Sequence, residues 1–162
     1  MTRLAFLSPA NAAPDVAIAS PIAHALGPGV TDVSHLGKLE LRGELARFEP
    51  AAGEELLPLA PSRALLVTAG SPAAAAARVA GARVRVYDQT AALAAFEFDG
   101  EDVLRRLTDL RRAQLPAVGA IARGTWALVE ARAGERFRVF VPQELGHHVV
   151  EVVVDTLRGL GR

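Results

Sequence analysis

The sequence predicts an α+β domain, and three observations lead to this class. Several short segments alternate apolar with charged residues, which is typical of half-buried strands. Other segments repeat apolar residues at the spacing of an amphipathic helix. From about residue 91 to the end, these segments follow the order strand, helix, three strands, helix, and a smaller unit precedes them. A chain of 162 residues that is 51% hydrophobic can bury a substantial core, so we expect one domain over residues 1–162.

The N-terminal arm, residues 1–29, is expected to be irregular because prolines interrupt it. Only Ser20–Leu26 looks helical, with Ser20 as the cap and Pro21 at the first helical position. The apolar residues of the arm lack a continuous periodic pattern. The arm therefore either packs over the sheet of its own domain or presents apolar side chains to a partner. The candidates for such a contact are Phe6, Leu7, Ile18 and Ile22.

The smaller unit begins with a predicted strand at "GKLELRG", residues 37–43. Leu39 and Leu41 lie on one of its faces and charged residues lie on the other, so we expect a half-buried strand. Residues 50–62 predict a connector with one helical turn. The apolar segment "RALLVTA" that follows predicts another strand.

A helix is predicted to follow, because Ser71 is a good N-cap, Pro72 suits the first helical position and Gly81 can end the helix. The next segment, "ARVRVYD", alternates apolar and polar residues again. It predicts a strand that turns Val84 and Val86 inward.

The segment "LAAFEFDG" predicts a strand that ends at Gly100. An amphipathic helix should begin near Glu101, with Asp99 as its cap and with Leu104 and Leu107 buried. Two favourable i,i+4 ion pairs are expected on its surface. They are Glu101–Arg105 and Asp102–Arg106.

Three further strands are predicted at Ala117–Ala122, Trp126–Ala131 and Phe137–Val141. Trp126 is expected in the core or at an interface. The last segment is rich in β-branched residues, but its apolar residues repeat at helical spacing and Pro142 suits a first turn, so we predict a C-terminal helix. The residues at helical spacing are Leu145, Val149, Val152, Thr156, Leu157 and Leu160.

The composition excludes several classes of function. Lys+Arg and Asp+Glu balance at 18 each, which argues against a general nucleic-acid binder or a polybasic membrane binder. The absence of cysteine removes disulfides, thiolate catalysis and Cys-ligated metal sites. No apolar stretch approaches the roughly 18 residues of a membrane span, and Leu4–Leu7 is too short for the core of a signal peptide. We therefore expect a cytoplasmic protein without nucleic-acid or membrane partners.

The sequence contains no motif for a cofactor, for a metal or for a complete catalytic group. It has neither a phosphate loop nor a dinucleotide-binding glycine pattern. His147 and His148 are adjacent, so on a helix they point about 100° apart and do not suit one metal ion. Ser34 and His35 are not a nucleophile pair on adjacency alone, because catalytic triads are assembled in space. A turn that leads into the next strand is the favoured interpretation.

Two carboxylates remain as candidate binding residues, and each has a structural alternative. Asp88 lies between two predicted strands, where an aspartate commonly forms a turn by accepting hydrogen bonds from nearby amides. Glu135 lies in a predicted hairpin turn, where the simplest role is that of a solvated side chain.

Three stretches resemble the aminomethyltransferase of the glycine cleavage system, the T-protein family. "VTDVSHLGKLELRG" is similar to the "DVSHMGK" segment near the start of that family, and "YDQTAALAAFEFDGEDVLRRLTDL" is similar to its strand–helix unit. "ARAGERFRVFVP" resembles its "R-x-G-Y-T-G-E-x-G-F-E-I-x-V-P" hairpin. The order is preserved from Thr31 to Leu157. The resemblance implies an aminomethyltransferase folate-binding-type domain with ferredoxin-like β-α-β-β-α units.

The chain also departs from that family. It has no Gly-Gly-x-x-Asp-Asp stretch between Gly43 and Asp88, and it lacks the cysteine of a related iron–sulfur maturation branch. Its hairpin is shortened, so that Glu135 matches the acid of the folate hairpin while Arg138 stands where a second acid is usual. Because carboxylates hold a pterin ring by hydrogen bonds, the resemblance implies Glu135 as a tetrahydrofolate ligand, with Asp88 as a more distant candidate, and Arg138 weakens this case.

The chain is about half as long as a full aminomethyltransferase and is similar to the gamma subunit of heterotetrameric sarcosine oxidase, whose "S-x-L-A-H-L" segment resembles "SPIAHAL" here. This resemblance implies a non-catalytic accessory subunit of an amine-oxidising, one-carbon-transferring oxidoreductase, with FAD, FMN and NAD bound by partner subunits. The alternative is a stand-alone tetrahydrofolate-binding protein or one-carbon transferase. A homo-oligomer with a structural role is the third possibility.

Overall fold

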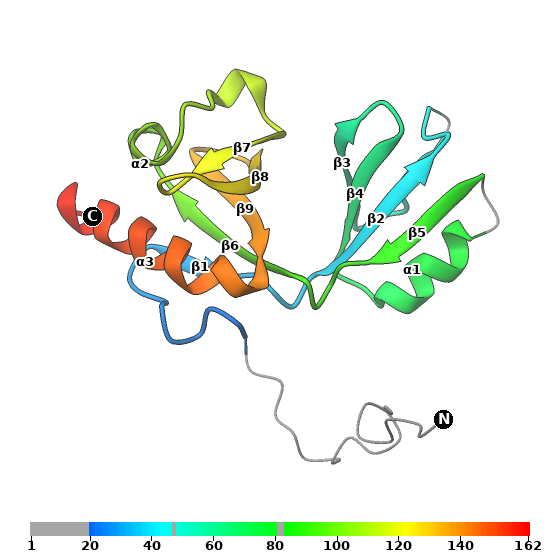
Figure 1. Cartoon of the computed structure of the whole chain (residues 1–162), viewed down its shortest axis with the longest axis horizontal. Coiled ribbons are helices and arrows are strands. Elements are labelled where there is room, and N and C mark those ends of the chain that lie inside the picture. Colours follow the sequence, from blue (N-terminus) through cyan, green and yellow to red (C-terminus); the bar gives the residue numbers. More distant parts are fainter. Residues whose placement is uncertain (1–19, 47, 81–82) are drawn as a thin grey trace, which may run out of the picture.

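The computed structural model describes residues 20–46, 48–80 and 83–162. In these ranges two antiparallel sheets form the two halves of the molecule, and helices pack on them (Figure 1). From Leu93 onward the chain follows the order strand, helix, three strands, helix, as predicted. The α+β class is therefore confirmed.

The five-stranded sheet has the order β1-β6-β9-β8-β7. Its strands are β1 (Val30–Asp32), β6 (Leu93–Asp99), β7 (Ala117–Ile121), β8 (Thr125–Ala131) and β9 (Arg136–Pro142). Strands β6 and β9 pair along their whole length, from Leu93 opposite Pro142 to Asp99 opposite Arg136. Helices cover one face of these strands and the four-stranded sheet covers the other, so most of their side chains are buried.

Two helices, α2 (Glu101–Leu107) and α3 (Gln143–Gly159), pack against this sheet and enclose the largest hydrophobic core. Leu104 and Leu107 of α2 are buried in it, as predicted. Helix α3 can approach the sheet closely at Gly146, because a Cβ there would lie 2.8 Å from Cβ of Ala94 and from Cγ2 of Ile22. The predicted C-terminal helix is confirmed.

The four-stranded sheet has the order β3-β4-β2-β5. Its strands are β2 (Gly37–Gly43), β3 (Glu54–Ala60), β4 (Arg63–Thr68) and β5 (Val84–Asp88). Helix α1 (Pro72–Val79) covers one face, and Ser71 caps it by accepting a 3.3 Å hydrogen bond from the Ala74 amide. Leu39 and Leu41 pack under α1, and Val84 and Val86 join this core as expected.

The second face of the four-stranded sheet packs on the five-stranded sheet. A separate apolar cluster fills the contact, and it consists of Leu57, Leu65, Val67, Ala95, Leu128 and Phe140. As a consequence β2 is buried on both faces over most of its length, and Lys38 and Glu40 are buried as well. The prediction of a half-buried strand with a charged outer face is therefore wrong for these two side chains.

One segment of the smaller unit and one segment of the arm also differ from expectation. The predicted connector over residues 50–62 contains the edge strand β3, which tolerates Pro58 because its register shifts between Pro58 and Ala60. Ser20–Leu26 forms turns instead of a helix, with i→i+3 hydrogen bonds from Ala23 to Ser20 and from Ala25 to Ile22.

Two details of α2 were predicted incorrectly. Gly100, at φ 113°, occupies the N-cap position, and the Asp99 carboxylate instead accepts a 3.2 Å hydrogen bond from Arg136. The Glu101–Arg105 pair is present at 2.7 Å, whereas Asp102 pairs with the C-terminal Arg162 at 3.2 Å and not with Arg106.

The apolar residues at the two ends of the chain have different positions from those expected. Ile22 is fully buried against α3, so it packs within its own domain and is not a partner contact. Phe6, Leu7 and Ile18 lie outside the described residues. In α3 the buried stripe differs from the predicted one, because of the predicted residues only Val149 and Leu157 are buried. Leu145 is exposed, and the other buried residues are Gly146, Val150, Val153 and Val154.

Candidate functional site

The segment that leads into β2 is a tightly bonded turn. Asp32 accepts a 2.8 Å hydrogen bond from the Ser34 amide, which closes the turn. The Ser34 hydroxyl donates to the Ala95 carbonyl at 3.1 Å and accepts from the Ala95 amide at 3.0 Å. Because the hydroxyl both donates to and accepts from the backbone of β6, Ser34 is not an activated nucleophile. His35 beside it is exposed. The interpretation of Ser34–His35 as a turn is confirmed.

The buried side chain of Lys38 stabilises this turn by hydrogen bonds to its backbone. Its side chain is fully buried, and its Nζ donates to the carbonyls of Ser34 at 2.8 Å and of Leu36 at 2.9 Å. The Lys38 amide donates a hydrogen bond to Thr90 Oγ1, and the Lys38 carbonyl accepts one from the Gln89 amide. The backbone of β2 is therefore bonded to the turn after β5. Burial lowers the pKa of Lys38 from 10.5 to about 8, although the nearby charges of Asp32 and Asp88 oppose the change.

A cluster of ion pairs links the five-stranded sheet to β3 of the four-stranded sheet. Arg138 lies between Glu97 and Glu130 on three adjacent strands, and it also reaches Glu55 of β3 in the other sheet. Its Nε donates to Glu97 and its Nη1 donates to Glu55, each at 2.8 Å. Arg132 donates to Glu55 at 2.5 Å and to Glu130 at 2.8 Å. Arg138 therefore has a structural role, because its guanidinium joins carboxylates of both sheets.

Two carboxylates of this cluster, the partly exposed Glu55 and the buried Glu130, have pKa shifts of opposite sign. Burial disfavours the charged form of Glu55, but hydrogen bonds and charge from Arg132 and Arg138 lower its pKa below the ordinary value. For Glu130 burial outweighs the same two arginines, and its pKa is raised. Glu130 Oε2 lacks a hydrogen-bond partner among the described residues, and lies 3.6 Å from Nη1 of Arg138.

The two carboxylates predicted from the sequence do not come together. Asp88 ends β5 and accepts a 2.8 Å hydrogen bond from the Thr90 amide, so it forms the turn that leads toward β6. Glu135 is exposed in the turn before β9, and its carbonyl accepts from the Gly100 amide at the far end of β6. Asp88 and Glu135 therefore lie near opposite ends of β6, about 20 Å apart for a strand of seven residues. They do not form one binding site.

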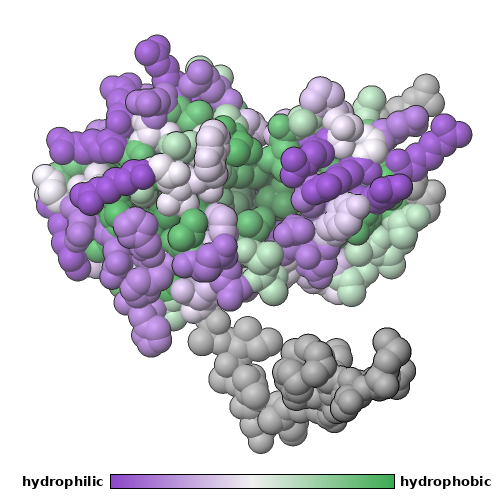
Figure 2. Space-filling view, in the orientation of Figure 1, coloured by the Kyte–Doolittle hydropathy of each residue, from purple (hydrophilic) through white to green (hydrophobic). Residues whose placement is uncertain are grey.

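A groove that sequence reasoning missed lies between the sheets. This inter-sheet groove has a volume of about 230 Å³. It is lined by Glu40, Leu59, Arg63, Leu65, Gln89, Leu93, Val118, Trp126, Ala127, Leu128, Phe140 and Pro142. Figure 2 shows apolar surface gathered in the hollow between the two halves. Trp126 is 67% exposed at its rim, so its prediction as a core residue is wrong and its prediction as an interface residue remains.

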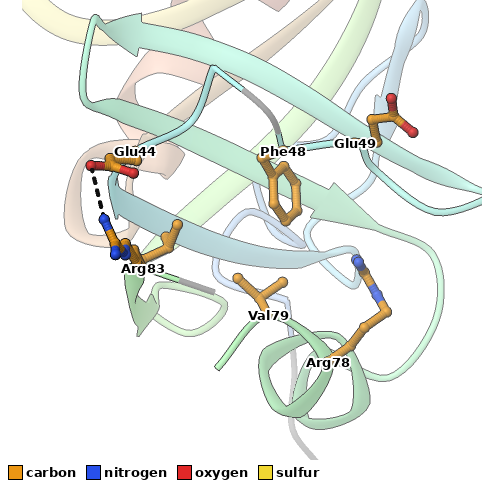
Figure 3. A pocket seen from close by; sticks show the side chains of 7 residues that line it. Glu44, Phe48, Glu49, Arg78, Val79 and Arg83 are labelled. Atoms are coloured by element: carbon orange, nitrogen blue, oxygen red, sulfur yellow. Dashed lines mark ion pairs between the residues drawn. The ribbon is translucent and has the colours of Figure 1, made fainter. Parts of the chain in front are cut away.

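A second hollow, of about 330 Å³, lies between α1 and the loop after β2 (Figure 3). Phe48 and Val79 line it, and Arg83 and Glu44 lie 3.9 Å apart at one edge of it. Arg78, which also lines it, is paired with Glu54. Arg78 is therefore already paired with a carboxylate of the chain, and Arg83 has only a loose, exposed contact with Glu44.

Neither a metal site nor a membrane-spanning helix was found in the part of the chain that the structure describes. No group of three His, Asp or Glu side chains there is arranged to hold a metal ion. None of the helices there is long and apolar enough to cross a membrane.

The two sheets and the helices that cover them form an α+β arrangement that also occurs in solved proteins. In a heterotetrameric sarcosine oxidase from Corynebacterium sp. U-96, one chain has this fold with a TM-score of 0.73 and 17% identity. The match covers 90% of the present chain and 97% of that chain, so the two have similar lengths. The fold and the resemblance predicted from the sequence are confirmed.

The second similar structure is glycine cleavage system aminomethyltransferase T from Bartonella henselae, with a TM-score of 0.56 and 18% identity. The match covers 78% of the present chain but 45% of that enzyme, so the chain spans less than half of it. No protein-family model and no curated protein match the sequence.

Proposed function

We propose that the chain is a non-catalytic accessory subunit of a heteromeric, amine-oxidising and one-carbon-transferring complex of the sarcosine oxidase type. The observation that carries the proposal is the match over nearly the whole of both chains with a chain of heterotetrameric sarcosine oxidase. In this proposal FAD, FMN and NAD are bound by partner subunits, and the assembly is cytoplasmic.

The use of polar residues within the chain supports this proposal. Ser34, Lys38 and Arg138 lie in the segments that resemble the family, and each is engaged by hydrogen bonds inside the fold. The candidate acids Asp88 and Glu135 are at opposite ends of β6, so they cannot act on one substrate. A subunit that stabilises or positions partners needs no active site of its own.

The proposal is tested by isolating the chain from its native source under mild conditions. We expect it to elute in a particle much larger than its own 17.0 kDa, together with visible flavin absorbance and with activity on a secondary amine. Elution alone, or as a homo-oligomer that holds no flavin, would contradict the proposal.

A stand-alone tetrahydrofolate-binding protein or one-carbon transferase is the second candidate, and one observation favours it. Glu135 is exposed in the hairpin and forms no ion pair with any described residue, so its carboxylate is available to a pterin. Reduced folate at about 100 times its dissociation constant should then stabilise the pure protein by about 2.7 kcal/mol. The same titration with Glu135→Gln is the control, and no stabilisation of either protein would reject this candidate.

A further inference from the structure

Three arginines form a row across adjacent strands of the four-stranded sheet. Arg42 of β2 lies directly opposite Arg63 of β4 and directly opposite Arg85 of β5. Directly opposed residues point to the same face of a sheet, and here this is the face that carries Glu40 and Leu65 toward the inter-sheet groove. A hollow of about 520 Å³ lies along the row and is lined also by Arg83. Arg63 lines both this hollow and the groove.

The carboxylates near the arginine row do not balance it. A single oxygen of Glu40 accepts from Arg42 at 2.6 Å and from Arg63 at 2.8 Å. Arg83 is 3.9 Å from Glu44, with both side chains largely exposed. Arg85 forms no ion pair with a residue that the structure describes. Like charges opposed across strands are destabilising, and the single carboxylate of Glu40 offsets this only in part, so a further anion beside Arg85 would stabilise the row.

The opposite wall of the groove is apolar and exposed. Trp126 lies opposite Ala120 and Val118 lies opposite Leu128, so Trp126 and Val118 are diagonal neighbours on one face of β7 and β8. They are 67% and 48% exposed, and the buried Leu128 continues their surface into the groove. In Figure 2 this apolar hollow is flanked by the hydrophilic surface of the four-stranded half.

We propose that the groove and the arginine row together dock an acidic segment of a partner subunit, with carboxylates on Arg42, Arg63 and Arg85 and an apolar side chain on Trp126. This inference rests on the proposed function, because it names the surface by which the subunit joins its complex. The charge of the row requires acidic residues in the partner, and the exposed tryptophan requires an apolar residue beside them.

The dimensions and composition of the site favour a protein segment over a metabolite. The groove, at about 230 Å³, is smaller than the roughly 300–1,000 Å³ that small-molecule pockets typically enclose, and Arg42 and Arg85 lie outside it along the second hollow. Tryptophan, tyrosine and arginine are the side chains that contribute most to protein–protein binding. All three occur here, and the Arg42 guanidinium lies 4.9 Å from the ring centre of Tyr87.

The test uses the native assembly and two pairs of matched variants. Arg85→Glu removes an exposed, unpaired arginine of the row, and Arg106→Glu on α2 is its control, since Arg106 is exposed and also without an ion pair among the described residues. Trp126→Ala removes the apolar contact, and Leu145→Ala on α3 is its control. All four positions are exposed, so circular dichroism should show folded proteins.

We expect Arg85→Glu and Trp126→Ala each to weaken incorporation into the assembly by about tenfold or more, and the two controls to incorporate normally. Added salt should weaken incorporation of the wild type more than that of Arg85→Glu. If the assembly exists but both groove variants join it normally, the docking site is wrong while the proposed function stands. If no assembly is isolated, both are wrong.

A second measurement uses synthetic peptides that cover the acidic stretches of the isolated partner subunits. Trp126 is the only tryptophan of the chain, so its fluorescence reports directly on the groove. One such peptide should shift the emission to the blue and protect Trp126 from quenching by acrylamide. The Arg85→Glu variant should bind that peptide more weakly. Triglutamate is the control probe. Equal binding of triglutamate, or protection of Trp126 only through self-association of this chain, would overturn the inference.

Discussion

Lys38 is the only lysine in the sequence, and its burial makes a measurable prediction about pH. Its Nζ is held by two backbone carbonyls. A neutral amine still has two N–H donors for these two acceptors, so the turn can keep its geometry when the proton leaves. Burial lowers the pKa of Lys38 from 10.5 to about 8.

The sign of the effect on stability follows from this pKa. Between pH 8 and pH 10.5 the unfolded chain binds the proton at Lys38 while the folded chain has released it. The free energy of unfolding therefore rises with pH through this window, and the gain is lost as the pH falls to 8. The difference between the two pKa values, at roughly 1.4 kcal/mol per pH unit, corresponds to about 3 kcal/mol.

Urea unfolding of the wild type and of Lys38→Met between pH 7 and pH 10.5 measures this gain. The wild type should become more stable relative to the variant by about 3 kcal/mol over the window. Because there is one lysine, NMR of labelled lysine also gives its pKa directly, even if the variant does not fold. A pKa near 10.5, or a pH-independent difference in stability, would refute the reasoning.

Three further changes test the packing. Arg138→Met should lower the free energy of unfolding by about 3–5 kcal/mol in urea, because Glu97 and Glu130 lose a buried partner; a loss below 1 kcal/mol would count against the cluster. Gly146→Ala should cost about 1–3 kcal/mol through overpacking, and an unchanged thermal midpoint would show that α3 can shift freely. Trp126→Ala should change stability by less than about 0.5 kcal/mol, and a larger loss would mean that its ring is packed.

Local signals in the sequence predicted most of the helices and strands. Ser71 and Pro72 mark the start of α1 with a hydrogen bond and a fixed dihedral angle, which act within one turn. The apolar spacing in α3 outweighed its β-branched composition, because a helix of this length with one apolar stripe buries that stripe against the sheet.

The features that the sequence did not predict depend on contacts between distant segments. Strand β3 contains a proline and is a strand because β4 pairs with it. Lys38 and Glu40 are buried because a second sheet covers a face that alternation alone marks as solvent-exposed. The inter-sheet groove combines residues from both sheets, so no motif in the sequence announces it. Only the unusual Trp126 gave a signal, as a possible interface residue.

Native mass spectrometry of the isolated assembly, followed by release of single subunits in the gas phase, tests the central claim most directly. The account predicts that this chain leaves a multi-subunit, flavin-containing particle as a species of 17.0 kDa with no added mass, while flavins remain with the partner subunits. Release of this chain with bound flavin or folate, or a native particle that consists of this chain alone, would contradict the account.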